Sequence, residues 1–278
     1  MRDQTPLSAL PEMPADAGGT PAMGAVNWIG LKTLYLREVR RFIKVYTQTL
    51  VAPLVTTLLF LAVFALALGG DQRTVAGMPF MTFLAPGLIM MAIAQNAFAN
   101  TSSSIVIAKI QGNIVDSLMA PLSAHELTFG FAIGGMTRGV AVAVVVWAAM
   151  AVAVDLGLHD LFFVVYHAVM GALMLSLLGL AGGIWADKFD HIAAVTNFVI
   201  TPLSFLSGTF YSIQNLPQGA QVAAHLNPFF YMIDGFRYGF IGHADGKLWI
   251  GVAVMAAMNG ALWGLCTWMF KTGYKLKA

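Results

Sequence analysis

The chain has 278 residues, of which 58% are apolar and only 10% are charged, and its mean hydropathy is +0.75. Average globular domains carry about 25% charged residues, so this composition excludes an ordinary soluble domain and indicates a polytopic membrane protein. The single cysteine, Cys266, lies in an apolar run, which excludes a disulfide framework within one chain. The first apolar run begins near Val45, too late for a removable signal peptide, so we expect that run to be a retained span.

The N-terminal region divides into a tail and a helix. Residues 1–26 are rich in Pro, Ala, Gly and Thr and have no apolar period, which predicts a disordered cytoplasmic tail. From residue 27 to residue 278 we expect one membrane domain. It opens with a helix over 28–46, which has apolar and aromatic residues on one face and a basic cluster on another: Arg37, Arg40, Arg41 and Lys44. Such a pattern is typical of an amphipathic helix in the membrane interface, with its basic face towards anionic headgroups.

The rest of the chain predicts an all-α fold with six transmembrane helices. Each apolar run is close to the roughly 20 residues that cross a bilayer, and the runs cover about 47–68, 80–99, 134–153, 161–185, 193–210 and 249–270. With six spans both termini lie on one side, and that side carries all of the 15 Lys and Arg except Arg73, Arg237 and Lys247. The positive-inside rule then predicts that both termini are cytoplasmic.

The segment between spans five and six has turn signals that argue against a further span. Asn215, with Gln218 three residues later, predicts a helix start, and Asn227 followed by Pro228 predicts another. A helix over 228–241 would be about 21 Å long, too short to cross. We therefore expect two short re-entrant helices that dip into the outer leaflet.

The polar segment 109–127, between spans two and three, predicts a structured cytoplasmic helix. Ile110, Ile114 and Leu118 share one face, and Pro121 ends the helix. Ser123 and Glu126 then form a capping box for the next helix. A structured helix in place of a loop suggests a docking surface.

Several polar residues within or beside the spans have more than one interpretation. The polar face of span two, Gln95, Asn96 and Asn100, is typical either of a transport pathway or of interhelical hydrogen bonds. Arg138 is interpreted as reaching the inner interface rather than as a substrate counter-ion. Glycine pairs four apart favour close helix packing, within the chain or in a dimer; they are Gly130/Gly134, Gly179/Gly183, Gly235/Gly239 and Gly260/Gly264.

The sequence has no motif for nucleotide chemistry. No GxxxxGK[ST] phosphate loop exists, and none of the 13 acidic residues is expected in the middle of a span, where a gradient-driven carrier would place its coupling carboxylates. Active transport would therefore need a motor on another chain. The alternative function is a membrane-embedded lipid or isoprenoid transferase that uses Asp187 and Asp190, although a solvated loop explains these aspartates better. The histidines show no metal-ligand spacing.

Five stretches carry a resemblance to a known family. They are QTLVAPLVTTLLF (48–60), FLAPGLIMM (83–91), NIVDSLMAPLS (113–123), PLSFLSGTFYS (202–212) and LNPFFYMIDGFRYGF (226–240). They resemble the permease subunits of type-2 ABC exporters, a class that includes nodulation-factor, polysaccharide and drug-export permeases, and within it the YadH-like bacterial inner-membrane permeases. The likeness covers about residues 28–275.

The resemblance implies a homodimer of permeases joined to two copies of a cytoplasmic ABC ATPase, which binds ATP and Mg²⁺; the permease itself is not an enzyme and holds no cofactor. It implies a substrate that is amphiphilic or hydrophobic (lipid, glycolipid, polysaccharide or drug), membrane lipids as further partners and no nucleic acid. The segment between spans two and three becomes the coupling helix, whose motion span two carries outwards. By position, the ATPase contacts are Asn113, Asp116, Ser117, Leu118 and Pro121, with Arg37, Arg40 and Arg41 nearby, and the outer gate comprises Phe205, Ser207, Gly208 and Tyr211. An acidic pair usual in this family near Val115–Asp116 is reduced here to Asp116.

Overall fold

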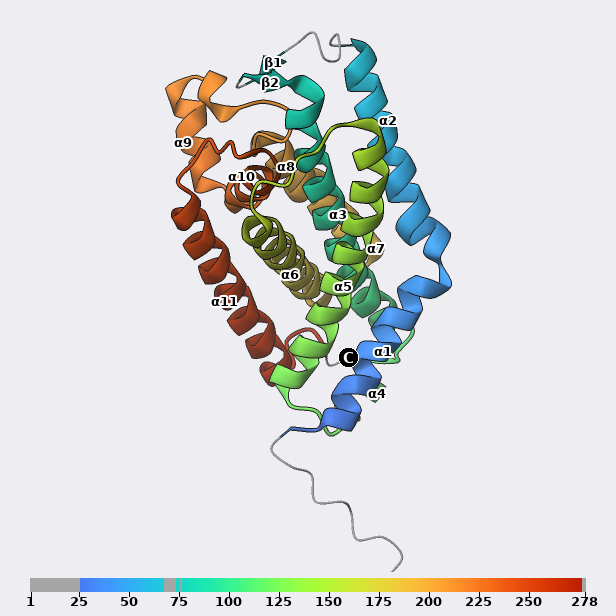
Figure 1. The fold of residues 1–278 in the computed structure, drawn as a ribbon. Helices are drawn as coiled ribbons and strands as arrows, with labels where there is room; N and C mark the ends of the chain where they lie inside the picture. Colours follow the sequence, from blue (N-terminus) through green and yellow to red (C-terminus); the bar gives the residue numbers. More distant parts are fainter. Residues whose placement is uncertain (1–25, 68–73, 76, 277–278) are drawn as a thin grey trace, which may run out of the picture.

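A computed structural model describes residues 26–67, 74–75 and 77–276, and the chain forms an elongated bundle of helices (Figure 1). The predicted tail, apart from Val26, lies outside these residues, as does Leu68 at the end of predicted span one. Within the described part, six helices are long and apolar enough to cross a membrane. The prediction of an all-α, six-span protein is therefore confirmed.

The spans follow one another in the predicted order, with some shifted ends. They are η2 (Thr47–Val51) with α2 (Ala52–Ala67), α3 (Phe80–Ile110), α5 (Ala124–Ala153), α6 (Leu161–Trp185), α7 (Phe189–Val195) with η4 (Thr196–Ile200) and α8 (Thr201–Leu206), and α11 (Leu248–Thr272). The fifth span starts and ends about four residues earlier than its apolar run. Its helix stops at Leu206 because Gly208 adopts a φ of +76°, a left-handed turn that favours glycine.

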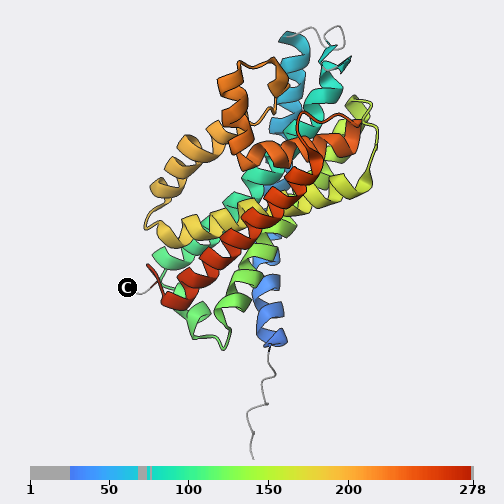
Figure 2. The same ribbon diagram turned by 90° about the vertical axis from the view of Figure 1, so that its left-hand side faces the viewer.

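The core is built around α3, which packs against both α5 and α6. In its apolar window 83% of the residues are buried, whereas only 11% are buried in the α2 span and in the α7–α8 span. Figure 2 shows α7 and α8 along one edge of the bundle. These two spans therefore leave most of their apolar surface uncovered by the chain itself.

Three of the four glycine pairs serve packing within the chain. A Cβ on Gly130 or Gly134 would meet Leu34 or Glu38 on α1 (Trp28–Lys44) at 2.5–2.6 Å. The pair on α6 packs on α3, and the pair on α10 (Pro228–Ile241) packs on α6 in the same way. Nothing lies within 4 Å of the positions that a Cβ would take on the α11 pair, Gly260/Gly264.

Two stretches of π-helix, η2 and η4, interrupt the first and fifth spans without any signal in the sequence. In η2 the Thr49 hydroxyl donates to Phe42 O (2.9 Å) and Val45 O (3.1 Å), so its side chain ties the start of the first span to the end of α1. π-Helical turns occur often at functional sites. Both lie in the least covered spans.

The segment between α3 and α5 contains a shorter helix than the sequence predicts. Helix α3 continues to Ile110, Gly112 breaks it with a φ of +76°, and α4 covers only Ile114–Met119. Ile110 is thus exposed at the end of α3 and does not continue the buried face of α4. The capping box at the start of α5 is confirmed: Ser123 N donates to Glu126 Oε2 (2.7 Å) and Glu126 N to Ser123 Oγ (3.3 Å).

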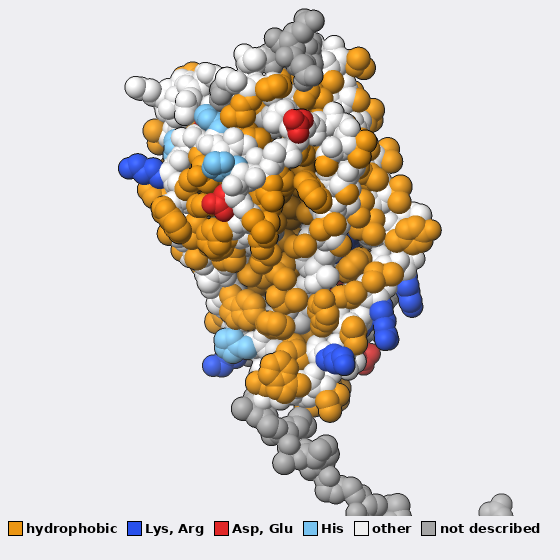
Figure 3. Space-filling view, viewed as in Figure 1, with side chains coloured by type: hydrophobic (Ala, Val, Ile, Leu, Met, Phe, Trp, Pro, Cys, Tyr) orange, Lys and Arg blue, Asp and Glu red, His pale blue; other side chains and the backbone are white. Residues whose placement is uncertain are grey.

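The opposite end of the bundle carries the short elements. A small hairpin, β1 (Thr74–Val75) and β2 (Met78–Pro79), precedes α3, and η5 (Ile213–Asn215), α9 (Gln218–Leu226) and α10 (Pro228–Ile241) precede α11. The prediction that Asn215 caps a helix is wrong, because it closes the 3-10 turn and α9 begins after Pro217. Asn227 does cap α10, accepting from Phe229 N at 3.0 Å. On the face in Figure 3, most Lys and Arg side chains gather at the end of α1 and α4.

Candidate functional site

Helices α1 and α4 are joined into one unit at the basic end of the bundle. Asn27, before α1, donates its backbone N–H to Glu126 Oε1 (2.6 Å) and its side-chain amide to Pro121 O (3.0 Å). Ten residues further on, Arg37 Nη1 donates to Ser117 Oγ on α4 (3.0 Å). Helix α1 is therefore bonded directly to α4 through Arg37, and the residue before it is bonded to the segment that connects α4 to α5 and to the start of α5.

The predicted ATPase-contact residues in and beside α4 have different exposures. Asn113, Asp116 and Pro121 are exposed, Leu118 is half-buried, and Ser117 is buried under Arg37. Between α1 and α4 lies a groove of about 230 Å³, lined by Gly30, Thr33, Leu34, Arg37, Asp116, Ser117, Ala120, Leu122 and Leu127. The exposed surface of α4 and the mouth of this groove are available to another chain, whereas Ser117 is available only to α1.

The three arginines of α1 also differ. Arg40 is exposed, and Arg37 is exposed with its guanidinium against α4. Arg41 instead points into the bundle, where its Nη2 donates to Asn100 O (2.6 Å) and Oδ1 (3.1 Å) and its Nη1 to Ser103 Oγ (3.2 Å). Arg41 thus joins α1 to α3 and has little left to offer a partner chain.

Glu38 lies at the centre of this arrangement although the sequence did not single it out. Its side chain is only 1% exposed and accepts hydrogen bonds from Ser104 Oγ (2.9 Å) and Arg41 Nη2 (3.1 Å), with Arg37 Nη2 at 3.4 Å. The one sequence signal was the i, i+3 spacing from Glu38 to Arg41. Glu38, Arg41, Asn100 and Ser104 form what we call the α1–α3 polar cluster.

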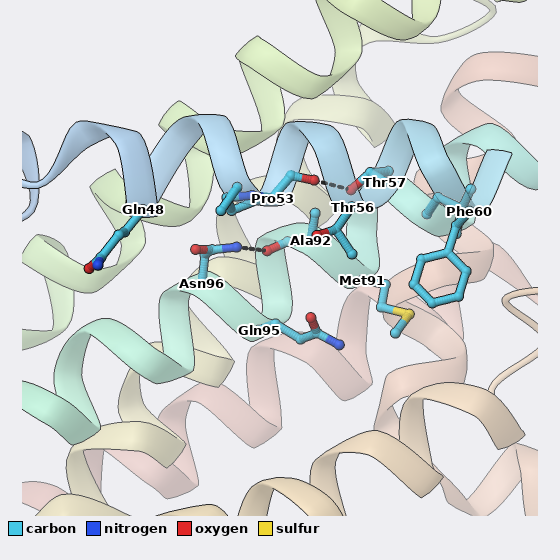
Figure 4. Close-up of a pocket in the computed structure, with 11 residues that line it drawn as sticks. Gln48, Pro53, Thr56, Thr57, Phe60, Met91, Ala92, Gln95 and Asn96 are labelled. Atoms are coloured by element: carbon cyan, nitrogen blue, oxygen red, sulfur yellow. Dashed lines mark hydrogen bonds between the residues drawn. The ribbon is translucent and has the colours of Figure 1, made fainter. Parts of the chain in front are cut away.

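The predicted pathway residues separate into two places. Gln95 and Asn96 line a cavity of about 250 Å³ between the first span and α3, together with Gln48, Ala52, Pro53, Thr56, Thr57, Phe60, Leu88, Met91 and Ala92. Figure 4 shows Thr56 and Asn96 between the two helices. Asn100 is fully buried and lies in the α1–α3 polar cluster. Gln95 and Asn96 thus border the cavity, while interhelical hydrogen bonds are made by Asn100 and also by Asn96.

Arg138 on α5 makes an interhelical bond that the sequence did not predict. Its Nη2 donates to Asn96 Oδ1 (2.9 Å), and the Asn96 amide donates to Ala92 O (3.0 Å). The Arg138 guanidinium is thus directed at the Asn96 side chain of α3. Asn96 is held in place by this contact while it lines the cavity.

The predicted outer-gate residues lie in the last turn of α8 and in the turn that follows it. Phe205 stacks on Phe210 with ring centroids 5.1 Å apart, Tyr211 donates its hydroxyl to Phe205 O (3.2 Å), and Ser207 Oγ donates to Leu203 O. Gly208 supplies the left-handed residue of the turn. Phe210 also meets Phe64 of α2 at 5.1 Å, so aromatic side chains join the two least covered spans.

A buried arginine attaches this turn to α3. Arg237 on α10 is 1% exposed, donates Nη2 to Gly208 O (2.6 Å), and places its guanidinium carbon 3.9 Å from the centre of the Phe83 ring. A Cβ on Gly87 would lie 2.6 Å from Thr209 O, so α3 and the turn also touch directly. The sequence places Arg237 among the outer charges and, three residues after Asp234 on a helix, as a local partner of that carboxylate. Its burial depends on long-range contacts that the sequence does not reveal.

Asp187, one of the aspartates of the alternative hypothesis, is engaged in a structural contact. Its carboxylate accepts from Lys275 Nζ (3.0 Å) and Lys109 Nζ (3.5 Å), and the Lys275 hydrogen bond holds the pKa of Asp187 below its usual range. Asp190 is exposed. No group of three or more metal-ligating side chains occurs in the described ranges. This arrangement does not favour transferase chemistry.

Comparisons with known proteins agree with these features. A family model described as ABC-2 type transporter matches residues 30–241. The chain is 39% identical to the inner membrane transport permease YadH of Escherichia coli K12, over 90% of this chain and 98% of the relative. It is also 26% identical to nodulation protein J of Rhizobium leguminosarum bv. trifolii, over 79% of this chain and 83% of that protein.

The match to the ABC-2 type transporter family indicates the role of the chain and the kind of partner it has. Such permeases are non-catalytic transmembrane subunits of ABC transporters, and the family implies association with an ABC ATPase subunit. The six spans and the inner-membrane relative agree with a multi-pass protein of the inner membrane. On its sequence match and its six-span fold, this chain belongs to the ABC-2 type transporter family, as a transport permease.

Proposed function

We propose that this permease is the membrane subunit of an ATP-driven exporter that moves an amphiphilic or hydrophobic molecule across the bacterial inner membrane. Two copies of the chain would join two copies of a separate cytoplasmic ABC ATPase, on which ATP and Mg²⁺ bind. The substrate class is a lipid, a glycolipid or polysaccharide, or a hydrophobic drug.

The surface of α4 is the observation that carries this proposal. Asn113, Asp116 and Pro121 are exposed at the basic end of the bundle. The Arg37–Ser117 hydrogen bond joins α4 to α1, and the Asn27–Pro121 hydrogen bond joins the turn after α4 to the residue that caps α1. A short helix that is both exposed and firmly attached can transmit a push from a partner. Closure of the ATPase pair would press on this surface and move α1 and α4 together.

Helix α3 is suited to carry that motion to the other end. At its inner half, Ser104 and Asn100 bind Glu38 and Arg41 of α1. At its outer half, Phe83 lies under Arg237, which holds the outer turn. Helix α3 thus contacts both α1 and the turn that we propose as the outer gate.

The uncovered spans are where the second copy and the substrate would lie. The α2 and α7–α8 spans bury the smallest share of their apolar windows, which favours them as dimer surfaces. The cavity with Gln95 and Asn96 opens beside α2 and has both amide and apolar lining, which suits an amphiphile. Between two such copies this surface would line the pathway, and lipid would cover the remaining faces.

Charge placement supports cytoplasmic termini. Helices α1 and α4 share one end of the bundle with the C-terminal end of α11, whose last turn contains Lys271 (Figure 1). Under the positive-inside rule that end faces the cytoplasm, where an ATPase can reach α4.

A charge reversal on α4 tests the proposal. Asp116→Lys, in the permease co-purified with its ATPase from native membranes, is expected to lower both the amount of associated ATPase and the rate of ATP hydrolysis. Asp155→Lys is the matched control, because Asp155 is also an exposed aspartate but lies at the opposite end, after α5. Unchanged association and hydrolysis in the α4 variant, or equal losses in both variants, would refute the coupling role of α4.

A further inference from the structure

An apolar slot opens on the side of the bundle between α5, α6 and α10. It has a volume of about 240 Å³, and its lining consists of apolar side chains only. Ile89 of α3 and Phe236 of α10 are buried at its base, and two alanines, Ala143 and Ala168, leave room between the helices. Trp147 stands at its rim, 43% exposed.

The surroundings of this slot are hydrocarbon. Both α5 and α6 are spans of a membrane permease, and Figure 3 shows hydrophobic side chains covering this side of the molecule, with a hollow among them. A recess without polar partners does not hold ordered water. It gains dispersion contacts when a hydrocarbon chain fills it.

One end of the slot leads to a polar mouth. A second cavity, of about 400 Å³, shares Leu158 and Phe240 with the slot and is also lined by Thr82, Gly157 and His159. Gly157, Leu158 and His159 lie where α5 has ended and α6 has not yet begun, whereas Thr82 belongs to α3 and Phe240 to α10. An apolar slot that continues into a polar mouth at the helix ends matches a molecule with one hydrocarbon chain below a polar head.

A second copy of the chain is a poorer occupant. The α5 and α6 spans bury 28% and 44% of their windows within the chain, whereas the α2 and α7–α8 spans bury 11% each and offer a larger uncovered surface. The slot is also a recess between helices, not a flat helical face. We propose that it binds one acyl chain of a bilayer glycerophospholipid, whose headgroup lies at the mouth beside Gly157 and His159.

Photo-labelling from the bilayer tests this site. The full-length permease is reconstituted in phosphatidylethanolamine vesicles that contain a phosphatidylethanolamine with a diazirine on one acyl chain, and labelled peptides are mapped by mass spectrometry. We expect labelling of the slot-lining parts of α5 and α6 to exceed labelling of the exposed face of α11. Ala168→Phe, which fills the slot, is expected to lower slot labelling about tenfold, equivalent to about 1.4 kcal/mol of binding.

Matched variants separate slot binding from general lipid contact. Ala257→Phe adds the same group to an exposed position of α11 and should leave slot labelling unchanged. If Ala168→Phe does not fold, Val144→Trp blocks the rim from a side chain that is 57% exposed and gives the same comparison. Slot labelling that matches α11, that persists in the filled variants, or that is absent because another copy covers the slot would overturn the proposal.

Discussion

Replacing Glu38 by glutamine is the sharpest test of how α1 is held to the bundle. The carboxylate is 1% exposed and accepts from Ser104, Arg41 and, at 3.4 Å, Arg37. An amide of the same shape keeps one acceptor oxygen but presents N–H groups to a guanidinium. The variant therefore keeps the packing and loses the charge-assisted contacts.

The size of the effect follows from burial. Removing one partner of a fully buried ion pair costs about 3–5 kcal/mol, but the Arg37 and Arg41 side chains are 49% and 32% exposed and can regain water. We therefore expect a loss of about 2 kcal/mol, within the range for hydrogen bonds to charged groups. At about 2–4 °C per kcal/mol, Tm should fall by about 4–8 °C.

Thermal unfolding of the purified chain in detergent, followed by intrinsic fluorescence, measures this shift. Asp116→Asn is the control, because Asp116 is exposed and its side chain has no hydrogen bond among the residues that the structure describes, so Tm should change by less than about 2 °C. If Glu38→Gln unfolds at the wild-type temperature, the α1–α3 polar cluster does not hold α1 in place, and its role in transmitting motion fails as well.

Three further predictions test other contacts. Gly179→Ala would place a Cβ 2.4 Å from a backbone oxygen of α3 and should lower the free energy of unfolding by about 1–3 kcal/mol. Gly264→Ala, with nothing within 4 Å of its Cβ position, should be neutral or slightly stabilising. Equal effects of the two substitutions would contradict the packing of α6 on α3. Arg237→Met should leave the Gly208 carbonyl of the outer turn without its arginine partner and lower the free energy of unfolding by about 1–3 kcal/mol. The turn should then become cleavable by added protease. An uncleaved turn and an unchanged Tm would contradict the attachment of this turn by Arg237. Because the pKa of Asp187 is lowered from 3.8, its contact with Lys275 should stabilise the C-terminal segment above pH 3.8 and be lost as the pH falls below that value. After correction for intrinsic rates, amide hydrogen exchange at residues 273–276 should rise only in that acid range. Asp187→Asn should abolish this rise in exchange.

The architecture could be predicted from the sequence because the bilayer requires long apolar runs, which are visible in the sequence. Apolar runs of about 20 residues specify the spans, and Pro121, Ser123 and Asn227 set helix boundaries through local geometry alone. Even Gly208 was placed at the end of span five by its neighbours in the family resemblance. These features depend on residues close together in the chain.

What the sequence could not predict depends on distant residues. Glu38 looks like an ordinary charge on an amphipathic helix until α3 brings Ser104 and Asn100 against it. Ser117 was grouped with the exposed residues of α4, yet Arg37 covers it. The break at Gly112 was missed because the apolar spacing of Ile110 and Ile114 continues through a residue that turns left-handed.

Cross-linking from α4 tests the central claim most directly. A photo-reactive benzoylphenylalanine is placed at Met119, which is 80% exposed on α4, and in a separate variant at Leu226, which is 81% exposed on α9 at the other end of the bundle. After irradiation of native membranes, we predict that Met119 captures an ATP-binding chain, identified by mass spectrometry, and that Leu226 does not. Absence of an ATP-binding chain at Met119, or equal capture at both positions, would contradict the assignment of α4 as the surface that receives the ATPase.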